Sequence, residues 1–358
     1  MKKLGIICGT LSRGGAERVA INIAEYMKNH GIEIYILTAG RAEDEYEVPI
    51  GIERIVLNNH VNKFLSVINS IIVLRKMIKK YSLDTIIIMG VPLCIYSIPG
   101  SVHTGTKIIV SERNDPHHFA GKKIVRIFSR FLMRFSDGFV FQTNDAKKYY
   151  NKIRKGRGIV IPNPLMADRL PVRYEGFREK IIINIGRLEQ QKNQKILIQA
   201  FSQIAQKYPG YRLIIYGEGS LRETLENEIK KHRQQDRIFL PGNYEDIHEK
   251  IRKASVFVLC SDFEGMPNAL IEAMALGIPC ISTDCPCGGP RELIKDGVNG
   301  ILIPVGDVKA LKEKIEYFIN NPDVSAACGR NALAIREELH MDNIGKLWYT
   351  YCMACGLD

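Results

Sequence analysis

The chain has 358 residues, of which 46% are hydrophobic and 8% aromatic, a composition typical of an ordinary globular protein. Its length exceeds that of most single doubly wound domains and suits two domains of about 170 residues each. The formal net charge of +11 favours an anionic partner, but the sequence shows no motif of a nucleic-acid-binding fold and no apolar run of about 18 residues that would span a membrane.

Nine cysteines in a chain of this size indicate reduced thiols in a cytoplasmic protein rather than a disulfide framework. The close pairs are Cys285 with Cys287 and Cys352 with Cys355. Neither has a second pair at the spacing of a zinc site, so we expect no metal ion.

The first half of the chain alternates apolar, strand-like segments with helical patterns. Helices are predicted at 16–29 and 62–80, and strands at 3–9, 33–38, 52–57, 84–89, 107–111, 138–142 and 158–161. These strands are apolar throughout, as expected for a parallel sheet that crossover helices cover on both faces. Residues 162–164 (Pro-Asn-Pro) end the pattern, and the polar stretch to Lys180 is interpreted as an interdomain linker.

The alternation then restarts, and helical segments close the chain from 308 to 355. Helices are predicted at 193–207, 221–232 and 267–276, and strands at 181–185, 212–216, 237–240, 256–260, 278–283 and 300–303. We therefore expect an α/β protein with two Rossmann-like, doubly wound domains facing a cleft, at 1–164 and 165–340. The segment 341–358 should form a C-terminal helix that packs back on the first domain. In such sheets ligands bind at the carboxyl ends of the strands.

The most informative segment follows the strand predicted at 256–260. Glu264 lies in a loop before a short helix, which we expect to begin at Pro267 and to end near Gly277, and Glu272 lies inside that helix. The helix start offers backbone N–H groups and the positive end of a dipole, so it favours an anion flanked by two carboxylates. A nucleotide sugar has this pattern, with phosphate in the middle and hydroxyls at both ends.

Two cations and a group of strand ends complete the candidate site in the second half. Arg187 and Lys192 follow the strand at 181–185 and could neutralise a diphosphate, unless they are simply solvated loop charges. Gly217, with Leu240 and Tyr244 at the end of the next strand, could admit a planar base, or these segments could be plain turns.

The first half offers two weaker candidates. Gly14 and Gly15 precede a helix, where an oxyanion or a sugar could bind, although the G-x-G-x-x-G spacing of dinucleotide sites is absent. The ionisable residues Glu112, His117 and His118 follow the strand at 107–111 and could bind or deprotonate an acceptor, unless they only form a polar loop.

Basic residues recur at every fourth position from 122 to 134. Lys122, Arg126, Arg130 and Arg134 form a cationic stripe beside apolar residues, a pattern that suits an anionic membrane surface. The same pattern would arise from a helix that packs its apolar face in the core and leaves its basic face in solvent.

With these motifs assigned, the chain resembles the family 4 glycosyltransferases of the GT-B class over essentially its whole length. The most specific element is the E-x7-E pair of Glu264 and Glu272, and further matches lie at 14–17, at 162–164 and at Gly186-Arg187 with Lys192. Segments 111–114 and 284–293 resemble bacterial members that build capsules, O-antigens, exopolysaccharides or lipid-linked oligosaccharides.

The resemblance implies a hexosyltransferase that retains anomeric configuration and needs neither a metal ion nor another cofactor. Arg187 and Lys192 would hold the diphosphate and stabilise the leaving group, Glu264 would meet the donor sugar, and Glu272 would meet the ribose. The remaining implied donor-site positions are Gly14, Gly15, Gly186, Gly217, Leu240, Tyr244, Gly265, Met266, Pro267, Asn268, Ala269 and Leu270.

The acceptor side departs from the family pattern. Arg113 stands where several relatives have a histidine, so the acceptor-side group is left open among Glu112, His117 and His118. The bacterial relatives suggest a UDP-sugar donor, a lipid-linked or growing glycan acceptor, and a peripheral position at the inner face of the cell membrane.

Two other functions share parts of this pattern. A nucleotide-sugar 2-epimerase would have the same fold and would convert the donor without any acceptor. A non-catalytic nucleotide-sugar-binding subunit is also conceivable, although such a subunit would have no reason to keep Glu264, Glu272, Arg187 and Lys192 together. Nucleic-acid binding is the least supported function, and it would show as salt-dependent affinity for a duplex.

Overall fold

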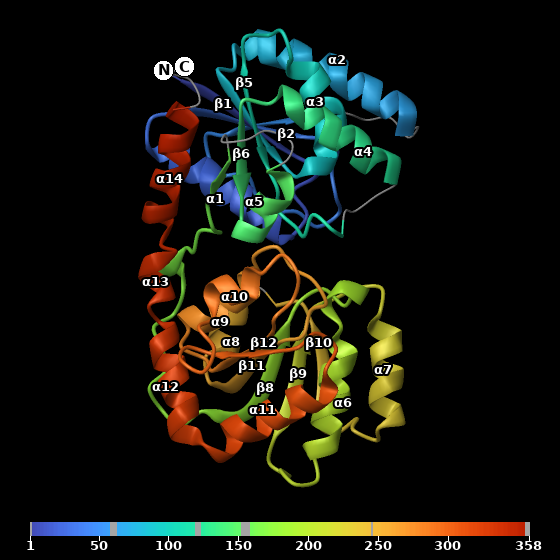
Figure 1. The fold of residues 1–358 in the computed structure, drawn as a ribbon, viewed down its shortest axis with the longest axis vertical. Coiled ribbons are helices and arrows are strands. Elements are labelled where there is room, and N and C mark those ends of the chain that lie inside the picture. Colours follow the sequence, from blue (N-terminus) through green and yellow to red (C-terminus); the bar gives the residue numbers. More distant parts are fainter. Residues whose placement is uncertain (1, 58–62, 119–122, 152–157, 245, 355–358) are drawn as a thin grey trace. The chain divides into compact units, whose positions relative to one another are not determined.

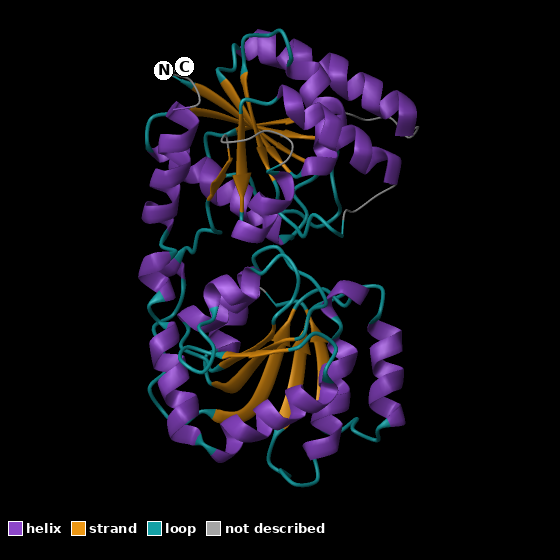
Figure 2. Cartoon of the chain, in the orientation of Figure 1, coloured by secondary structure: helices purple, strands orange, loops and turns teal. Residues whose placement is uncertain are grey.

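The computed structural model describes residues 2–57, 63–118, 123–151, 158–244 and 246–354 (Figures 1 and 2). The chain divides into two compact units. Unit 1 comprises residues 1–164 and 341–358, and unit 2 comprises residues 165–340.

Unit 1 is built on a parallel sheet of seven strands in the order β3-β2-β1-β4-β5-β6-β7. Each strand coincides with a predicted one, and helices cover the sheet (Figure 2). The strands are β1 (Lys3–Cys8), β2 (Glu33–Thr38), β3 (Glu53–Val56), β4 (Thr85–Met89), β5 (Lys107–Ser111), β6 (Gly138–Phe141) and β7 (Gly158–Val160). The helices are α1 (Gly15–Asn29), α2 (Lys63–Tyr81), η1 (Val91–Leu93), α3 (Cys94–Ser101), α4 (Lys123–Leu132), η2 (Met133–Phe135) and α5 (Asn144–Tyr150).

The last helix, α14 (Met341–Ala354), belongs to unit 1 and packs against α1. Gly345 allows this approach, because a Cβ there would lie 2.6 Å from the ring of Tyr26. Tyr351 fixes the other end, since its hydroxyl donates to the carbonyl of Phe139 at 3.1 Å and accepts from the N–H of Phe139 at 2.9 Å. Trp348, the single tryptophan of the chain, is fully buried in this contact layer.

Unit 2 is built on a second parallel sheet, of six strands in the order β10-β9-β8-β11-β12-β13. The strands are β8 (Glu179–Ile185), β9 (Arg212–Tyr216), β10 (Ile238–Gly242), β11 (Ala254–Leu259), β12 (Cys280–Thr283) and β13 (Ile301–Ile303). The helices are η3 (Ala167–Arg169), η4 (Gln190–Lys192), α6 (Gln194–Ile204), α7 (Arg222–Lys231), α8 (Ile247–Ile251), α9 (Asn268–Ala275), α10 (Gly289–Leu293), α11 (Val308–Asn320), α12 (Pro322–Ala332) and α13 (Ile335–Glu338).

Both sheets are therefore doubly wound, which confirms the fold class predicted from the sequence. In unit 2 the strand order reverses between β8 and β11, which are hydrogen-bonded neighbours. The loops after these two strands leave the same edge of the sheet on either side of the reversal. This topological switch point is where open α/β sheets bind their ligands.

The segment 162–180, predicted to be an interdomain linker, contains the boundary between the two units after Pro164, and the rest of it belongs to unit 2. Asn163 is buried in unit 1 and accepts a hydrogen bond from Arg113. In unit 2 the N–H of Leu165 donates to the carbonyl of Leu339 at 2.7 Å, and Arg178 donates to three backbone carbonyls. These hydrogen bonds tie both ends of the segment 165–178 to unit 2.

Candidate active site

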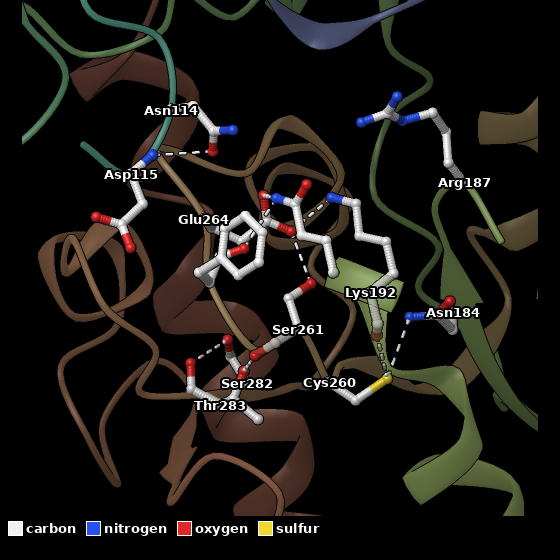
Figure 3. A network of polar contacts seen from close by, with 12 residues as sticks. Asn114, Asp115, Asn184, Arg187, Lys192, Cys260, Ser261, Glu264, Ser282 and Thr283 are labelled. Atoms are coloured by element: carbon white, nitrogen blue, oxygen red, sulfur yellow. Dashed lines mark hydrogen bonds and ion pairs between the residues drawn. The ribbon is translucent and has the colours of Figure 1, made fainter. Parts of the chain in front are cut away.

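A buried ion pair lies at the switch point of unit 2. Lys192, in the loop after β8, places its Nζ 2.5 Å from Oε1 of Glu264, in the loop after β11 (Figure 3). The hydroxyl of Ser261 donates to the same carboxylate oxygen at 2.6 Å. Glu264 is only 6% exposed, so this carboxylate depends on the protein for its hydrogen bonds. The two loops thus form one preorganised polar cluster.

Backbone contacts hold the same two loops in register. The N–H of Asp262 donates to the carbonyl of Gln191 at 2.8 Å, and the side chain of Gln191 donates to the carbonyl of Phe263 at 2.9 Å. Asn193 adopts a left-handed conformation (φ 45°) between η4 and α6, and its amide donates to the carboxylate of Asp262 at 2.7 Å. Asparagine tolerates this conformation better than most residues, which explains its place at this turn.

Arg187 differs from Lys192 in its exposure and in its contacts, although both residues come from the loop after β8. Its side chain is exposed, and the described residues provide no hydrogen-bond partner for its guanidinium. Figure 3 shows Lys192 directed at Glu264, whereas the guanidinium of Arg187 lies apart from this pair. The loop therefore supplies one cation that is already paired and one that is available to an external anion.

Glycines let the loops of this sheet edge approach one another. Gly217 has a φ of +139°, and a Cβ there would lie 2.0 Å from the carbonyl oxygen of Gly186. A Cβ on Gly289 would lie 1.7 Å from the carbonyl oxygen of Gly265. Any side chain at Gly217 or Gly289 would push these loops apart, so the cluster geometry depends on them.

Helix α9 follows the cluster, but it begins one residue later than predicted. Pro267 is the N-cap, with extended backbone and no side-chain cap, and the helix starts at Asn268. Gly265, Met266, Pro267 and Leu270 are buried, whereas Asn268 and Ala269 are half-buried. A proline ring cannot accept a hydrogen bond from the first turn, so side-chain capping by Pro267 is impossible and the helix start keeps its anion-binding character.

The second carboxylate pairs with a residue that the sequence analysis missed. Oε2 of Glu272, inside α9, lies 2.9 Å from Nε2 of His248 on α8. Glu272 is also buried. Helix α8 is a single short turn, and its approach to α9 is a tertiary contact for which the sequence gives no signal.

The strand ends beside this pair carry aromatic rings. Tyr244 is exposed and packs edge-on against Tyr216 at 5.8 Å between ring centroids, with the amine of Lys250 4.3 Å from the Tyr244 centroid. Leu240 instead packs against the core of unit 2. Of these two predicted positions, Tyr244 presents a surface to which a planar ligand could stack.

In unit 1 the glycine pair forms the start of α1. Gly14 is the N-cap without a side-chain cap, and Gly15 is the first helical residue. A Cβ on Gly14 would lie 2.3 Å from the carboxylate of Glu17, so a larger residue would displace that side chain.

Glu112 lies buried at the end of β5, where it anchors its own loop. One carboxylate oxygen accepts from the N–H groups of Arg113 at 2.9 Å and Asn114 at 3.2 Å, and the other accepts from the hydroxyl of Tyr150 at 2.7 Å. Burial raises the pKa of Glu112 despite these hydrogen bonds, and burial lowers the pKa of Arg113 to about 10.

The two histidines of the following loop are exposed. Nδ1 of His118 lies 2.6 Å from the carboxylate of Asp115, which is buried and also accepts from the N–H of His117 at 3.0 Å. The ring of His117 packs against Tyr149 at 4.6 Å between centroids. A buried carboxylate bound to Nδ1 fixes the orientation of the His118 ring, as in histidines that exchange protons or bind substrates.

The structure describes three of the four residues of the basic stripe. Lys122 lies outside the described residues, and Arg126 and Arg134 are carried by α4 and η2. Arg130 donates to the hydroxyl of Tyr149 at 2.9 Å, so this arginine also has a packing role within unit 1. Of the two interpretations of this pattern, the one in which the helix packs its apolar face in the core is wrong, because most of these apolar residues are exposed.

Comparison with known families and structures identifies the class of protein. Residues 13–169 match the family described as Glycosyltransferase Family 4, and residues 175–334 match the family described as Glycosyl transferases group 1. The fold is shared with HepE of Anabaena, solved in complex with UDP-glucose, at a TM-score of 0.85 and 18% identity over 99% of this chain and 100% of that one. The chain is a GT-B glycosyltransferase.

Two relatives of this glycosyltransferase act on bacterial glycans, as their names state. An α-1,4-N-acetyl-D-galactosaminyltransferase of Campylobacter jejuni, named for a GalNAc-GalNAc-diNAcBac-PP-undecaprenol substrate, is 27% identical over 97% of this chain and 97% of its own. A lipopolysaccharide 1,6-galactosyltransferase of Salmonella typhimurium is 26% identical over 64% of both chains.

The part of this glycosyltransferase that the structure describes has neither a metal-ion cluster nor a membrane-spanning helix. Its His, Cys, Asp and Glu side chains form no group of three or more that could hold a metal ion. Within the same residues, no helix combines the length and the apolar character needed to cross a bilayer.

Proposed function

We propose that this glycosyltransferase moves a hexose or N-acetylhexosamine from a nucleoside diphosphate sugar, preferably a UDP-sugar, to a lipid-linked or growing glycan of the cell surface. The observation that carries the proposal is the cluster of Lys192, Glu264 and Ser261 at the switch point of unit 2, next to the start of α9. It supplies a cation, a buried carboxylate and a helix N-terminus within one sheet edge.

The diphosphate fits the positive groups of this edge. Arg187, which is exposed, and Lys192 bind its oxygens, and the backbone at 268–270 faces the phosphate at the positive end of α9. Since Lys192 starts in an ion pair with Glu264, it is held in place before the donor arrives. Positive charge that is fixed in advance stabilises a departing diphosphate without reorganisation.

The two carboxylates divide the rest of the donor between them. Glu264 accepts from sugar hydroxyls, and Glu272, oriented by His248, accepts from the ribose. The base lies beside Tyr244 and Gly217, where an exposed ring and a strand end without a side chain leave room for a planar group.

The transfer retains configuration by attack on the face that the diphosphate leaves. The bond between the anomeric carbon and the phosphate oxygen breaks, the acceptor oxygen bonds to that carbon, and the acceptor proton passes to the departing phosphate. This step requires neither a metal ion nor a covalent enzyme intermediate.

As the group that binds the acceptor, His118 is favoured over Glu112 by the contacts of the two side chains. The oxygens of Glu112 are taken by its own loop and by Tyr150, whereas the exposed His118 ring is oriented by Asp115. His117 and Arg113 belong to the same loop after β5. The names of the relatives support a lipid-linked glycan as the acceptor. We propose that the enzyme works at the inner face of the cell membrane, where such an acceptor would lie.

A thermal-shift panel of UDP-, GDP- and ADP-sugars tests the donor. A ligand at about 100 times its dissociation constant adds about 2.7 kcal/mol to the free energy of unfolding. We expect a rise in melting temperature with a UDP-sugar that is lost in the Glu272→Gln variant. Incubation with the donor alone separates transfer from epimerisation, because an epimerase would convert the sugar without an acceptor.

A further inference from the structure

Helix α4 and the adjoining η2 expose their most apolar side chains. Five large hydrophobic residues of these elements are between 51% and 64% exposed, namely Ile124, Ile127, Phe128, Phe131 and Phe135. Their spacing of three or four residues along the chain places them on one stripe of the helix.

The opposite side of α4, which packs on unit 1, is less apolar than the exposed one. Ser129 of α4, Met133 of η2 and Ser136 just after η2 are fully buried there. A surface helix of a globular protein ordinarily turns its apolar stripe to the core and its polar residues to water. This helix does the reverse, so its exposed stripe requires another apolar environment.

Helix α2 presents a second stripe of the same kind. Leu65, Ile68 and Ile72 are between 42% and 61% exposed, and their spacing again places them on one helical face. Helices α2 and α4 both pack against α3, and Figure 1 shows the three gathered on one side of unit 1.

The charged residues of the helices that carry these stripes have a single sign. Neither 63–83 nor 116–136 contains an aspartate or a glutamate. Within α2, α4 and η2 the basic residues are Lys63, Arg75, Lys76, Lys79, Lys80, Lys123, Arg126, Arg130 and Arg134. Apolar side chains interleaved with basic ones match the acyl boundary and the headgroups of an anionic bilayer.

We propose that the exposed stripes of α4 and α2 insert into the surface of an anionic membrane, with the neighbouring Lys and Arg residues on the headgroups. The inference deepens the proposed function, because it assigns the surface by which the enzyme reaches a lipid-linked acceptor. A second copy of the chain fits this surface less well, since a two-fold interface would bring the basic residues of α2 and α4 against those of the other copy. Because burial of the apolar stripes contributes to membrane binding along with charge attraction, salt should weaken the binding without abolishing it.

Co-sedimentation of the full chain with vesicles tests the insertion. The wild type should bind vesicles of phosphatidylcholine with phosphatidylglycerol, and should bind pure phosphatidylcholine measurably but more weakly. It should keep part of its binding at 0.5 M salt, where the screening length falls below the roughly 8 Å of physiological salt and attraction between exposed charges is weak. The triple variant Ile124→Ser, Ile127→Ser and Phe128→Ser should lose about 100-fold in vesicle affinity, as expected from three large apolar groups that stay in water.

A matched control removes three apolar residues elsewhere that are more exposed than those of the triple variant. Ile50, Val172 and Phe177 are at least 75% exposed and lie outside α2 and α4. The variant with serine at all three should bind vesicles like the wild type. Arg130 is left unchanged in every variant, because it bonds to Tyr149 within unit 1.

A tryptophan reporter measures insertion directly. The single native tryptophan, Trp348, is fully buried in unit 1 and should not respond to lipid. In the Phe128→Trp variant, emission should shift to the blue when vesicles are added, and lipids brominated near the headgroup end of the acyl chain should quench it.

Three results would overturn the inference. The first is binding that salt removes completely, without quenching of the reporter, which would mean electrostatic contact alone. The second is no binding to anionic vesicles. The third is self-association in sedimentation that the triple variant abolishes, which would assign the surface to a second copy. UDP-sugar binding without vesicles, measured on the same triple variant, should be unchanged; loss of donor binding in the wild type would instead contradict the proposed function.

Discussion

Replacing Lys192 with alanine should have two separable effects, one on stability and one on turnover. The side chain of Lys192 is 18% exposed and that of Glu264 is 8% exposed. Removing one partner of a buried pair leaves an uncompensated charge and costs about 3–5 kcal/mol. Because Lys192 retains some contact with water, we expect the lower end, about 3 kcal/mol. For a unit of this size, this lowers the melting temperature by about 6–12 °C.

The double variant Lys192→Ala, Glu264→Gln separates the two effects. It removes the stranded charge, so its stability should recover by about 2 kcal/mol relative to Lys192→Ala alone. Turnover should not recover, because the lost cation would act on the departing diphosphate, a contact worth on the order of 100-fold or more. Urea unfolding and initial-rate measurements on the four proteins of this cycle provide both readouts. Additive destabilisation in the double variant, or recovery of turnover, would refute the argument.

Other predictions rest on single contacts. Arg187→Ala should lower turnover by about 100-fold with little change in melting temperature, since the side chain is exposed; normal turnover in initial-rate assays would exclude it from the diphosphate site. Glu272→Gln should weaken UDP binding more than Glu264→Gln does. His248→Ala should also weaken UDP binding, by a smaller factor, because His248 orients Glu272. Calorimetric titration of UDP measures these affinities, and equal losses in the two glutamine variants would contradict the division of roles between the carboxylates. Turnover should persist in excess chelator, and a loss that magnesium or manganese restores would show a metal requirement. Hydrogen bonds from Arg54 hold the pKa of Glu45 at about 2, below its ordinary value of 4.5. Because the folded-state pKa is depressed, the stabilisation is complete above about pH 4.5 and is lost as the pH falls towards 2, so Glu45→Gln should flatten the pH dependence of urea unfolding within that window.

The order of strands and helices could be predicted from the sequence because its apolar runs are long and regularly punctuated. Each predicted strand has a counterpart in the structure, with boundaries that differ by at most two residues. The short helices were harder. Helix α3 contains Pro99 and α8 is a single turn, so neither has enough length for a periodic apolar pattern.

The sequence predicted which residues lie in the loops of the candidate site, but not which of them form ion pairs. Parallel strand ends meet at one sheet edge, so the sequence placed Lys192 and Glu264 in neighbouring loops without showing that they form an ion pair. His248 was missed because its contact with Glu272 depends on how α8 packs on α9. The exposure of the apolar stripe on α4 was also invisible, since periodicity shows that a stripe exists but not which way it faces.

Transfer of labelled sugar from a UDP-sugar to a lipid-linked acceptor tests the central claim most directly. The purified chain, incubated with a labelled UDP-sugar and undecaprenyl-diphosphate-linked glycan, should move label into the organic phase and release UDP in equal amount. The new linkage should keep the anomeric configuration of the donor by NMR, and Lys192→Ala should abolish the transfer. Label that remains on the nucleotide across the panel of donor sugars, whether unchanged or converted to an epimer, would contradict the account.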